Sequence, residues 1–186
     1  MRQDYETSKL YYGFPVILLG YKDANFKYNF TTNSSSYTLG DMMVIGFHSR
    51  SNAAKQIMNF KEFTVNVPDE DLMNEIEIGG FFHKVDKIPL SKLEYEIGEF
   101  VDAPLFTACP ISIECKVENV VMYGENANVI ASIKKRVVNS NLIEDGKLNS
   151  DKLNPVIFLG DEHEKIYRYL RNLSDKAGKF YKSQFE

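Results

Sequence analysis

The chain has 186 residues, 44% hydrophobic and 26% charged, a composition typical of one globular domain, which we expect to span residues 1–186. Its net charge of −4 argues against general nucleic-acid binding, because that function requires a basic face. The N-terminal residues resemble no signal peptide and no apolar run reaches membrane-spanning length, so we expect a cytoplasmic protein without a membrane partner.

The first half of the chain predicts a β-rich fold. Residues 14–20 are apolar enough for a strand buried on both faces, and the turn residues Asp23–Asn25 predict a hairpin with the next strand. Three further strands are expected at 27–32, 42–47 and 62–67. Helices are expected at 52–60 and from Pro68 to Gly79–Gly80.

The second half predicts a long excursion and then more strands. Residues 81–106 contain Pro89 and Pro104 and predict a long excursion that is irregular but ordered, a kind of loop that is often functional. Strands are expected at 111–121, 128–138 and 156–159. The tail from Asp161 has apolar residues at helical spacing and predicts a helix. Several strands follow one another too closely for crossover helices, so we expect a mainly β small barrel with peripheral helices.

Recognisable catalytic and metal motifs are absent. The sequence contains no GxGxxG, GxxxxGK[ST] or GxSxG pattern. His48, His83 and His163 are far apart and have no metal-ligand spacing. Cys109 and Cys115 are six residues apart, which excludes a CxxC redox or zinc motif. We therefore expect no metal site and no catalytic acid or base.

Residues 27–55 combine a strand, a loop rich in hydroxyls and amides, a second strand and a basic helix start. Backbone N–H groups at the helix start favour an anionic phosphate, and Arg50 and Lys55 add positive charge. The alternative interpretation is a serine-rich loop followed by an ordinary helix N-cap. The residue types alone favour this alternative, and the order of the elements makes the ligand site an equally supported interpretation.

Seven segments, in this order, resemble the flavin reductase-like proteins, the FMN-binding split barrels that include flavoredoxin. The segments are PVILLGY, YNFTTNSSS, FHSRSNAAKQI, EFTVNVPDEDL, VDKI, CPISIECKV and NPVIFLG, and the resemblance runs from about Tyr11 to Gly160. It implies a split β-barrel, FMN as cofactor, NAD(P)H as a transient co-substrate, and a homodimer with each flavin near the subunit interface.

The resemblance also implies a set of cofactor contacts. Residues 29–35 match the segment that lines the flavin ring edge and ribityl chain, and residues 48–51 match the segment that holds the phosphate. Lys87 matches a lysine that reaches the cofactor, and Phe158 an apolar residue near the ring. The expected cofactor-binding residues are Asn29, Thr31, Thr32, Asn33, Ser34, Ser35, His48, Ser49, Arg50, Ser51, Lys55, Lys87 and Phe158.

The expected function is NAD(P)H-dependent flavin reduction. Hydride transfer from a nicotinamide to flavin N5 needs stacking and alignment rather than a protein acid or base, which agrees with the missing catalytic motifs. One alternative is a flavoredoxin-like electron carrier with a redox protein partner and little NAD(P)H activity of its own. A weaker one is a split-barrel oxidase of a phosphorylated small molecule, such as a pyridoxine derivative.

Overall fold

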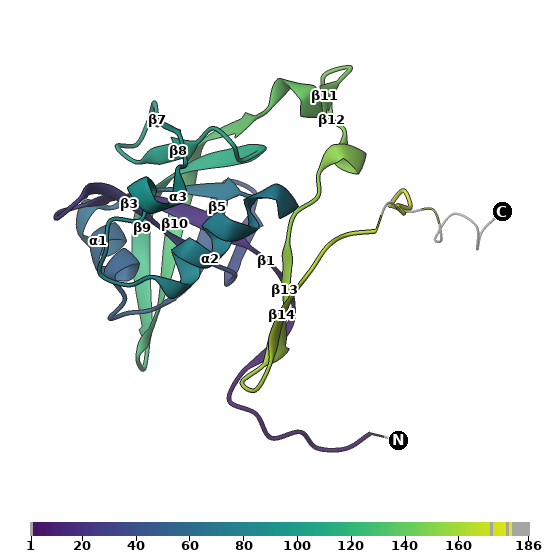
Figure 1. Cartoon of the computed structure of the whole chain (residues 1–186), viewed down its shortest axis with the longest axis horizontal. Coiled ribbons are helices and arrows are strands. Elements are labelled where there is room, and N and C mark those ends of the chain that lie inside the picture. The colour runs from purple at the N-terminus through teal and green to yellow at the C-terminus, as the bar shows by residue number, and fades with distance from the viewer. Residues whose placement is uncertain (1, 172, 178, 180–186) are drawn as a thin grey trace.

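The computed structural model describes residues 2–171, 173–177 and 179, and its body is a seven-stranded antiparallel sheet (Figure 1). The strand order is β3-β2-β6-β9-β10-β5-β4. These strands are β2 (Ile17–Asp23), β3 (Lys27–Asn33), β4 (Ser36–Leu39), β5 (Met42–His48), β6 (Glu62–Val67), β9 (Ile111–Tyr123) and β10 (Asn126–Val138).

The remaining elements surround this sheet. A three-stranded sheet lies to one side in Figure 1 and contains β1 (Leu10–Pro15), β13 (Ile157–Asp161) and β14 (Lys165–Arg168). Two short hairpins pair β7 (Tyr95–Ile97) with β8 (Pro104–Phe106), and β11 (Ile143–Glu144) with β12 (Lys147–Leu148). The helices are α1 (Asn52–Phe60), α2 (Met73–Phe81) and α3 (Ile88–Ser91), with 3-10 turns at Glu70–Leu72, Ser140–Leu142 and Ser150–Lys152. None of the helices in the described residues is long and apolar enough to cross a membrane.

The two edges of the large sheet lie next to each other. β3 and β4 form opposite edges, yet only Ser34 and Ser35 separate them in the chain, so the sheet must curl until its edges meet. At this seam the Asn33 side chain of β3 reaches β5, where its Nδ2 donates to the Gly46 carbonyl at 2.8 Å. The Gly46 N–H donates to the Ser35 carbonyl at 2.8 Å and extends the β4–β5 ladder by one residue. Among the described strands no ladder joins β3 to β4 or β5. The fold is therefore the predicted mainly β split barrel.

β2 is buried on both faces, as its unbroken apolar sequence predicts. Ile17 and Leu19 belong to the cluster that α1 covers through Ile57, whereas Leu18 belongs to a second cluster with Ile76 of α2. The expected strand at 14–20 is, however, divided between β1 and β2, which lie in different sheets. The chain passes from the three-stranded sheet to the seven-stranded sheet between Pro15 and Ile17. The continuous hydrophobic pattern of the sequence does not indicate this break.

α2 packs unusually close to β3. A side chain at Gly79 would place its Cβ 2.4 Å from Thr32 Oγ1 and 2.9 Å from the Thr32 backbone nitrogen, so only glycine fits. The Thr32 hydroxyl donates to the Ile76 carbonyl at 2.6 Å, and the Thr31 hydroxyl donates to the Gly79 carbonyl at 3.3 Å. The helix ends at Phe81, one residue beyond the predicted end at Gly79–Gly80. Gly79 allows the close helix–strand contact, whereas a Cβ at Gly80 would lie 3.8 Å from Thr32 Cβ, an ordinary contact distance.

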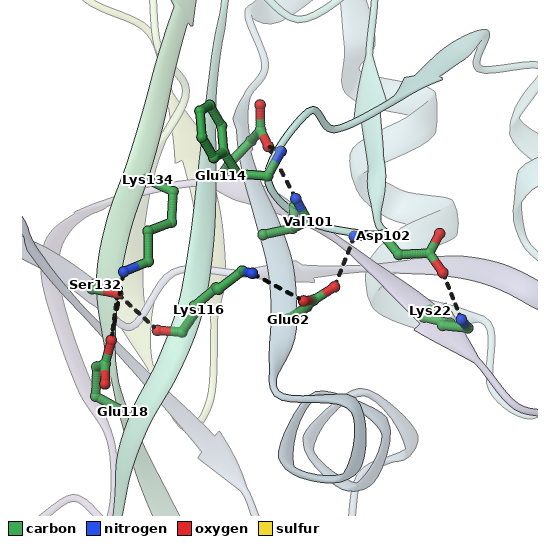
Figure 2. Close-up of polar contacts among 10 residues, drawn as sticks. Lys22, Glu62, Val101, Asp102, Glu114, Lys116, Glu118, Ser132 and Lys134 are labelled. Atoms are coloured by element: carbon green, nitrogen blue, oxygen red, sulfur yellow. Dashed lines mark hydrogen bonds and ion pairs between the residues drawn. The ribbon is translucent and has the colours of Figure 1, made fainter.

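The excursion at 81–106 is ordered, as expected, and most of it lies outside helices and strands, but it is not irregular throughout, because it contains α3 and the β7–β8 hairpin. Two carboxylates from the large sheet hold the loop between β7 and β8 (Figure 2). Glu114 Oε2 accepts from the backbone N–H groups of Phe100 and Val101 at 2.6 and 3.2 Å. Glu62 Oε2 accepts from the Asp102 N–H at 2.8 Å.

The tail also differs from the prediction. Residues 165–168 form β14, which pairs antiparallel with β13, where helical spacing predicts a helix from Asp161. An unpaired edge of β13 is available to this segment, and its β-branched and aromatic residues Ile166 and Tyr167 suit a strand. Pairing with a neighbouring strand thus overrides the local periodicity. Residues 169–171 and 173, where the helical spacing continues, form no helix either, and residue 172 lies outside the described part of the chain.

Candidate flavin site

A cavity of about 270 Å³ lies where α1 begins, beside β3 and the segment that precedes α3; we call it the polar cavity. Five of the residues expected to bind a cofactor line it: Asn29, Thr31, Arg50, Ser51 and Lys87. They come from three separate parts of the sequence, so the fold itself brings them together. In the described residues no group of three histidine, cysteine or acidic side chains could hold a metal ion.

The first turn of α1 forms one wall of the polar cavity, through Ser51, Asn52 and Ala53. Ser51 is the N-cap of α1, and its hydroxyl accepts a hydrogen bond from the Ala54 N–H at 3.2 Å. The ordinary N-cap interpretation is therefore correct for this hydroxyl. It does not exclude the ligand interpretation, because the first turn of the helix and Arg50 both line the same cavity.

Lys87 supplies a buried positive charge on another wall. Its side chain is only 6% exposed, and its ammonium group donates to the Gly79 carbonyl at 2.7 Å. Within the described part of the chain no carboxylate lies within ion-pairing distance of this ammonium group. Burial lowers the pKa of Lys87 to about 8, because removal from water disfavours the charged form. An anionic ligand in the cavity would provide the counter-charge that the protein lacks.

Asn29 holds the Lys87 segment against β3. Its side chain is buried, and its Nδ2 donates to the Val85 carbonyl at 2.9 Å. Its Oδ1 accepts from the backbone N–H groups of Phe30 at 2.9 Å and Lys87 at 3.3 Å. Three of the four hydrogen bonds available to an amide side chain are thus made within the protein. The structure therefore gives Asn29 a positioning role that the sequence does not reveal.

A second cavity, of about 340 Å³, adjoins the next residues of β3; we call it the apolar cavity. Four expected cofactor contacts line it: Thr32, Asn33, Ser34 and Phe158. The Phe158 ring packs edge-on against Tyr11, with 4.9 Å between ring centroids, and tilted against Tyr167 at 5.7 Å. Aromatic and apolar groups beside hydroxyls and amides suit a flat heterocycle with polar edges.

Four expected contacts line neither cavity: Ser35, His48, Ser49 and Lys55. Ser35 is exposed at the seam, and Lys55 is exposed on α1. His48 and Ser49 contact Glu125, at the tip of the β9–β10 hairpin. Of residues 48–51, the segment expected to hold a phosphate, only Arg50 and Ser51 line the polar cavity.

The structure adds residues that could not be selected from the sequence. Tyr21, Asn52, His83 and Lys84 also line the polar cavity, and Glu77, Phe81, Lys165 and Tyr167 also line the apolar one. Tyr167 falls in the segment wrongly expected to be helical. Glu125 comes close to the phosphate segment through the pairing of Asn126 with His48, a register that the sequence pattern does not specify.

The comparison with protein families agrees with this geometry. The family model described as the flavin reductase like domain matches residues 12–163. The chain belongs to the flavin reductase-like family.

Solved structures of this family share the whole fold. The chain is similar to a flavoredoxin from Methanosarcina acetivorans, with 22% identity, a TM-score of 0.88 and 99% coverage of both chains. It is also similar to the flavoredoxin of Desulfovibrio vulgaris (Miyazaki F), with 21% identity, a TM-score of 0.85 and coverage of 96% of this chain and 98% of the other. An uncharacterized protein of Bacillus subtilis (strain 168), YdfE, is 23% identical over 94% of this chain and 91% of its own length.

Proposed function

We propose that this flavin reductase-like protein binds FMN in the two cavities and reduces it with NADH or NADPH. The observation that carries the proposal is the convergence of Arg50, Ser51, the α1 N-terminus and the buried Lys87 on one cavity. A helix N-terminus beside a guanidinium group is suited to a phosphate, and the uncompensated Lys87 ammonium group favours an anionic ligand. We also propose that the protein is located in the cytoplasm and forms a homodimer.

In this arrangement each wall of the site has a distinct task. Arg50 and the first turn of α1 hold the phosphate in the polar cavity. Thr32, Asn33 and Ser34 offer hydrogen bonds to the polar ring edge, and Phe158 packs against the ring in the apolar cavity. When bound, FMN supplies the hydride acceptor, its N5 atom. Lys87 adds a fixed positive charge in a water-poor environment, where electrostatic stabilisation of an anion is strongest.

The alternative is an electron carrier that holds FMN and receives electrons from a protein partner. Its support is the near-complete overlap of the chain with two flavoredoxins. Steady-state oxidation of NADH and NADPH with added FMN separates the two functions. Turnover supports the reductase, and stable flavin binding without turnover supports the carrier.

The first experiment is FMN titration of the purified protein, followed by flavin fluorescence and by the visible spectrum after removal of free flavin. We expect saturable binding that Arg50→Ala weakens about tenfold, because a hydrogen bond between charged groups is lost. Lys55→Ala is the matched control: it removes an equal charge from the same region but from outside the cavity, so it should change affinity less than about twofold. Failure of the folded wild-type protein to bind FMN would reject the proposal.

A further inference from the structure

We propose that Glu125 competes with the FMN phosphate for Arg50, and so lowers the affinity of the site for phosphorylated flavin. This inference rests on the proposed function and specifies how the same site is regulated. The Glu125 carboxylate forms an ion pair with the Arg50 guanidinium group, the cation that the phosphate would require. The consequence is an FMN that exchanges readily, as a substrate does, instead of one that is held permanently.

The geometry places this carboxylate between two side chains of the phosphate segment. Arg50 Nη2 lies 2.8 Å from Glu125 Oε1, and His48 Nε2 lies 3.5 Å from Glu125 Oε2. Arg50 is also a wall residue of the polar cavity, whereas Glu125 is not. Arg50 is therefore a residue of the cavity wall that pairs with a carboxylate outside the cavity. The Glu125 carboxylate and a bound phosphate would compete for the same guanidinium group.

The backbone of Glu125 has a separate task. Its carbonyl accepts from the Ser49 N–H at 2.8 Å and from the Ser49 hydroxyl at 2.9 Å. These bonds attach the tip of the β9–β10 hairpin to the phosphate segment, and they do not involve the carboxylate. A substitution of the Glu125 side chain should therefore change the charge near Arg50 without releasing the segment.

The pair is weak enough to be exchanged. Its two side chains are 75% and 61% exposed, and ion pairs in such positions contribute little, because water screens them. A phosphate at the helix N-terminus carries a larger negative charge and accepts paired hydrogen bonds from a guanidinium group. The ligand therefore displaces Glu125 from Arg50, but its affinity is reduced by the contact that must first be broken.

The test compares Glu125→Gln with a matched control, Glu118→Gln. Glu118 lies on the same hairpin and its side chain is 58% exposed; its carboxylate contacts Ser132 and Lys134, at 2.6 and 3.8 Å, away from the cavity (Figure 2). Both variants change the net charge of the protein equally. The probes are FMN and riboflavin, which differ in the phosphate alone, and circular dichroism confirms that each variant is folded.

We expect Glu125→Gln to tighten FMN binding about two- to fivefold and to leave riboflavin binding unchanged, since only the phosphate needs Arg50. Glu118→Gln should leave both affinities unchanged. In an Arg50→Ala background the gain from Glu125→Gln should largely disappear, because the contested cation is gone.

Other results would overturn the inference. Weaker FMN binding by Glu125→Gln would make Glu125 a residue that positions Arg50. Equal FMN affinity in wild type and variant, or an equal gain for riboflavin, would also exclude competition for the phosphate while leaving the proposed function intact. Absence of FMN binding by all the proteins would instead reject the proposed function and this inference together.

Discussion

Lys87 is a single side chain whose buried charge lowers the stability of the folded protein and would favour the binding of an anion. Its buried ammonium group donates to a carbonyl oxygen and has no counter-charge in the part of the chain that the structure describes, an arrangement that destabilises the folded state. A hydrophobic side chain of similar length would pack there without that penalty. An anion bound in the adjoining polar cavity would reduce the energetic cost of burying this charge. Stability given up at a binding site is common in natural proteins.

This argument predicts a pH-dependent effect of Lys87→Met. The folded pKa of Lys87 is about 8 and its ordinary value is 10.5, so the unfolded chain binds more protons between these values. The free energy of unfolding of the wild type should therefore rise by about 2 kcal/mol relative to the variant between pH 7 and pH 9.5. Urea denaturation of both proteins at the two pH values measures this difference, in which other titrating groups cancel. A constant difference would show that Lys87 is not desolvated.

Residue types in a local pattern allow part of the site to be predicted. Arg50 and Ser51 could be selected because a basic residue before a helix N-cap is recognisable in sequence. The partners of Asn29 and Lys87, which are Val85 and Gly79, lie on other elements and depend on how closely α2 approaches β3. Glu125 likewise depends on strand register. Contacts of this kind follow from the three-dimensional packing and have no signature in the sequence.

At the scale of elements, the β9–β10 hairpin makes contacts that hold both a loop of the fold and the candidate site. Near one end of β9, the buried Glu114 fixes the loop between β7 and β8, and at the tip Glu125 contacts the phosphate segment. Glu114 is fully buried, and its Oε1 has no hydrogen-bond partner among the described residues. A buried carboxylate is expensive, so its retention reflects the N–H groups that it satisfies.

We therefore expect Glu114→Ala to lower the free energy of unfolding by about 2–4 kcal/mol, because the N–H groups of Phe100 and Val101 lose their acceptor. Glu118→Ala, on the exposed part of the same strand, should lower it by less than about 1 kcal/mol. Urea denaturation measures both. Equal effects of the two substitutions would show that the loop does not depend on Glu114.

The elements that could be predicted are those whose residues alternate or repeat locally. The strands near 27–33, 42–48 and 62–67 and the helix at 52–60 agree with the sequence pattern to within one residue. The tail was predicted wrongly because apolar residues three and four apart are compatible with a helix, whereas β14 forms through pairing with β13. The break between β1 and β2 was missed because both flanking segments are apolar.

At the scale of the whole molecule, exposed apolar side chains occur on two segments, β4 and the tip of the β9–β10 hairpin. They include Tyr37 and Leu39 on the edge strand, and Met122 and Tyr123 at the hairpin. β4 also begins directly after the seam residues Ser34 and Ser35. An exposed edge strand with apolar side chains is suited to association with another chain. We propose that the edge strand β4 contributes to a homodimer in which the flavin lies near the subunit interface.

Sedimentation equilibrium tests this proposal. The wild type should have about twice the chain mass of 21.4 kDa at micromolar concentration. Leu39→Glu should shift the equilibrium toward the monomer, because a charge would be buried in the interface. Leu148→Glu places the same charge on an exposed apolar position of β12 and should leave the mass unchanged. A monomeric wild type would reject the homodimer.

The pairing of β1 with β13 has a consequence for the order in which the protein is made. β1, β2 and β3 leave the ribosome early, but the partner strand of β1 and the wall residues Phe158, Lys165 and Tyr167 leave it late. A nascent chain can therefore complete most of the large sheet while the apolar cavity still lacks a wall. Until β13 has been synthesised, β1 has an unpaired edge and exposed apolar side chains. We therefore expect the nascent chain to be most prone to aggregation during this interval.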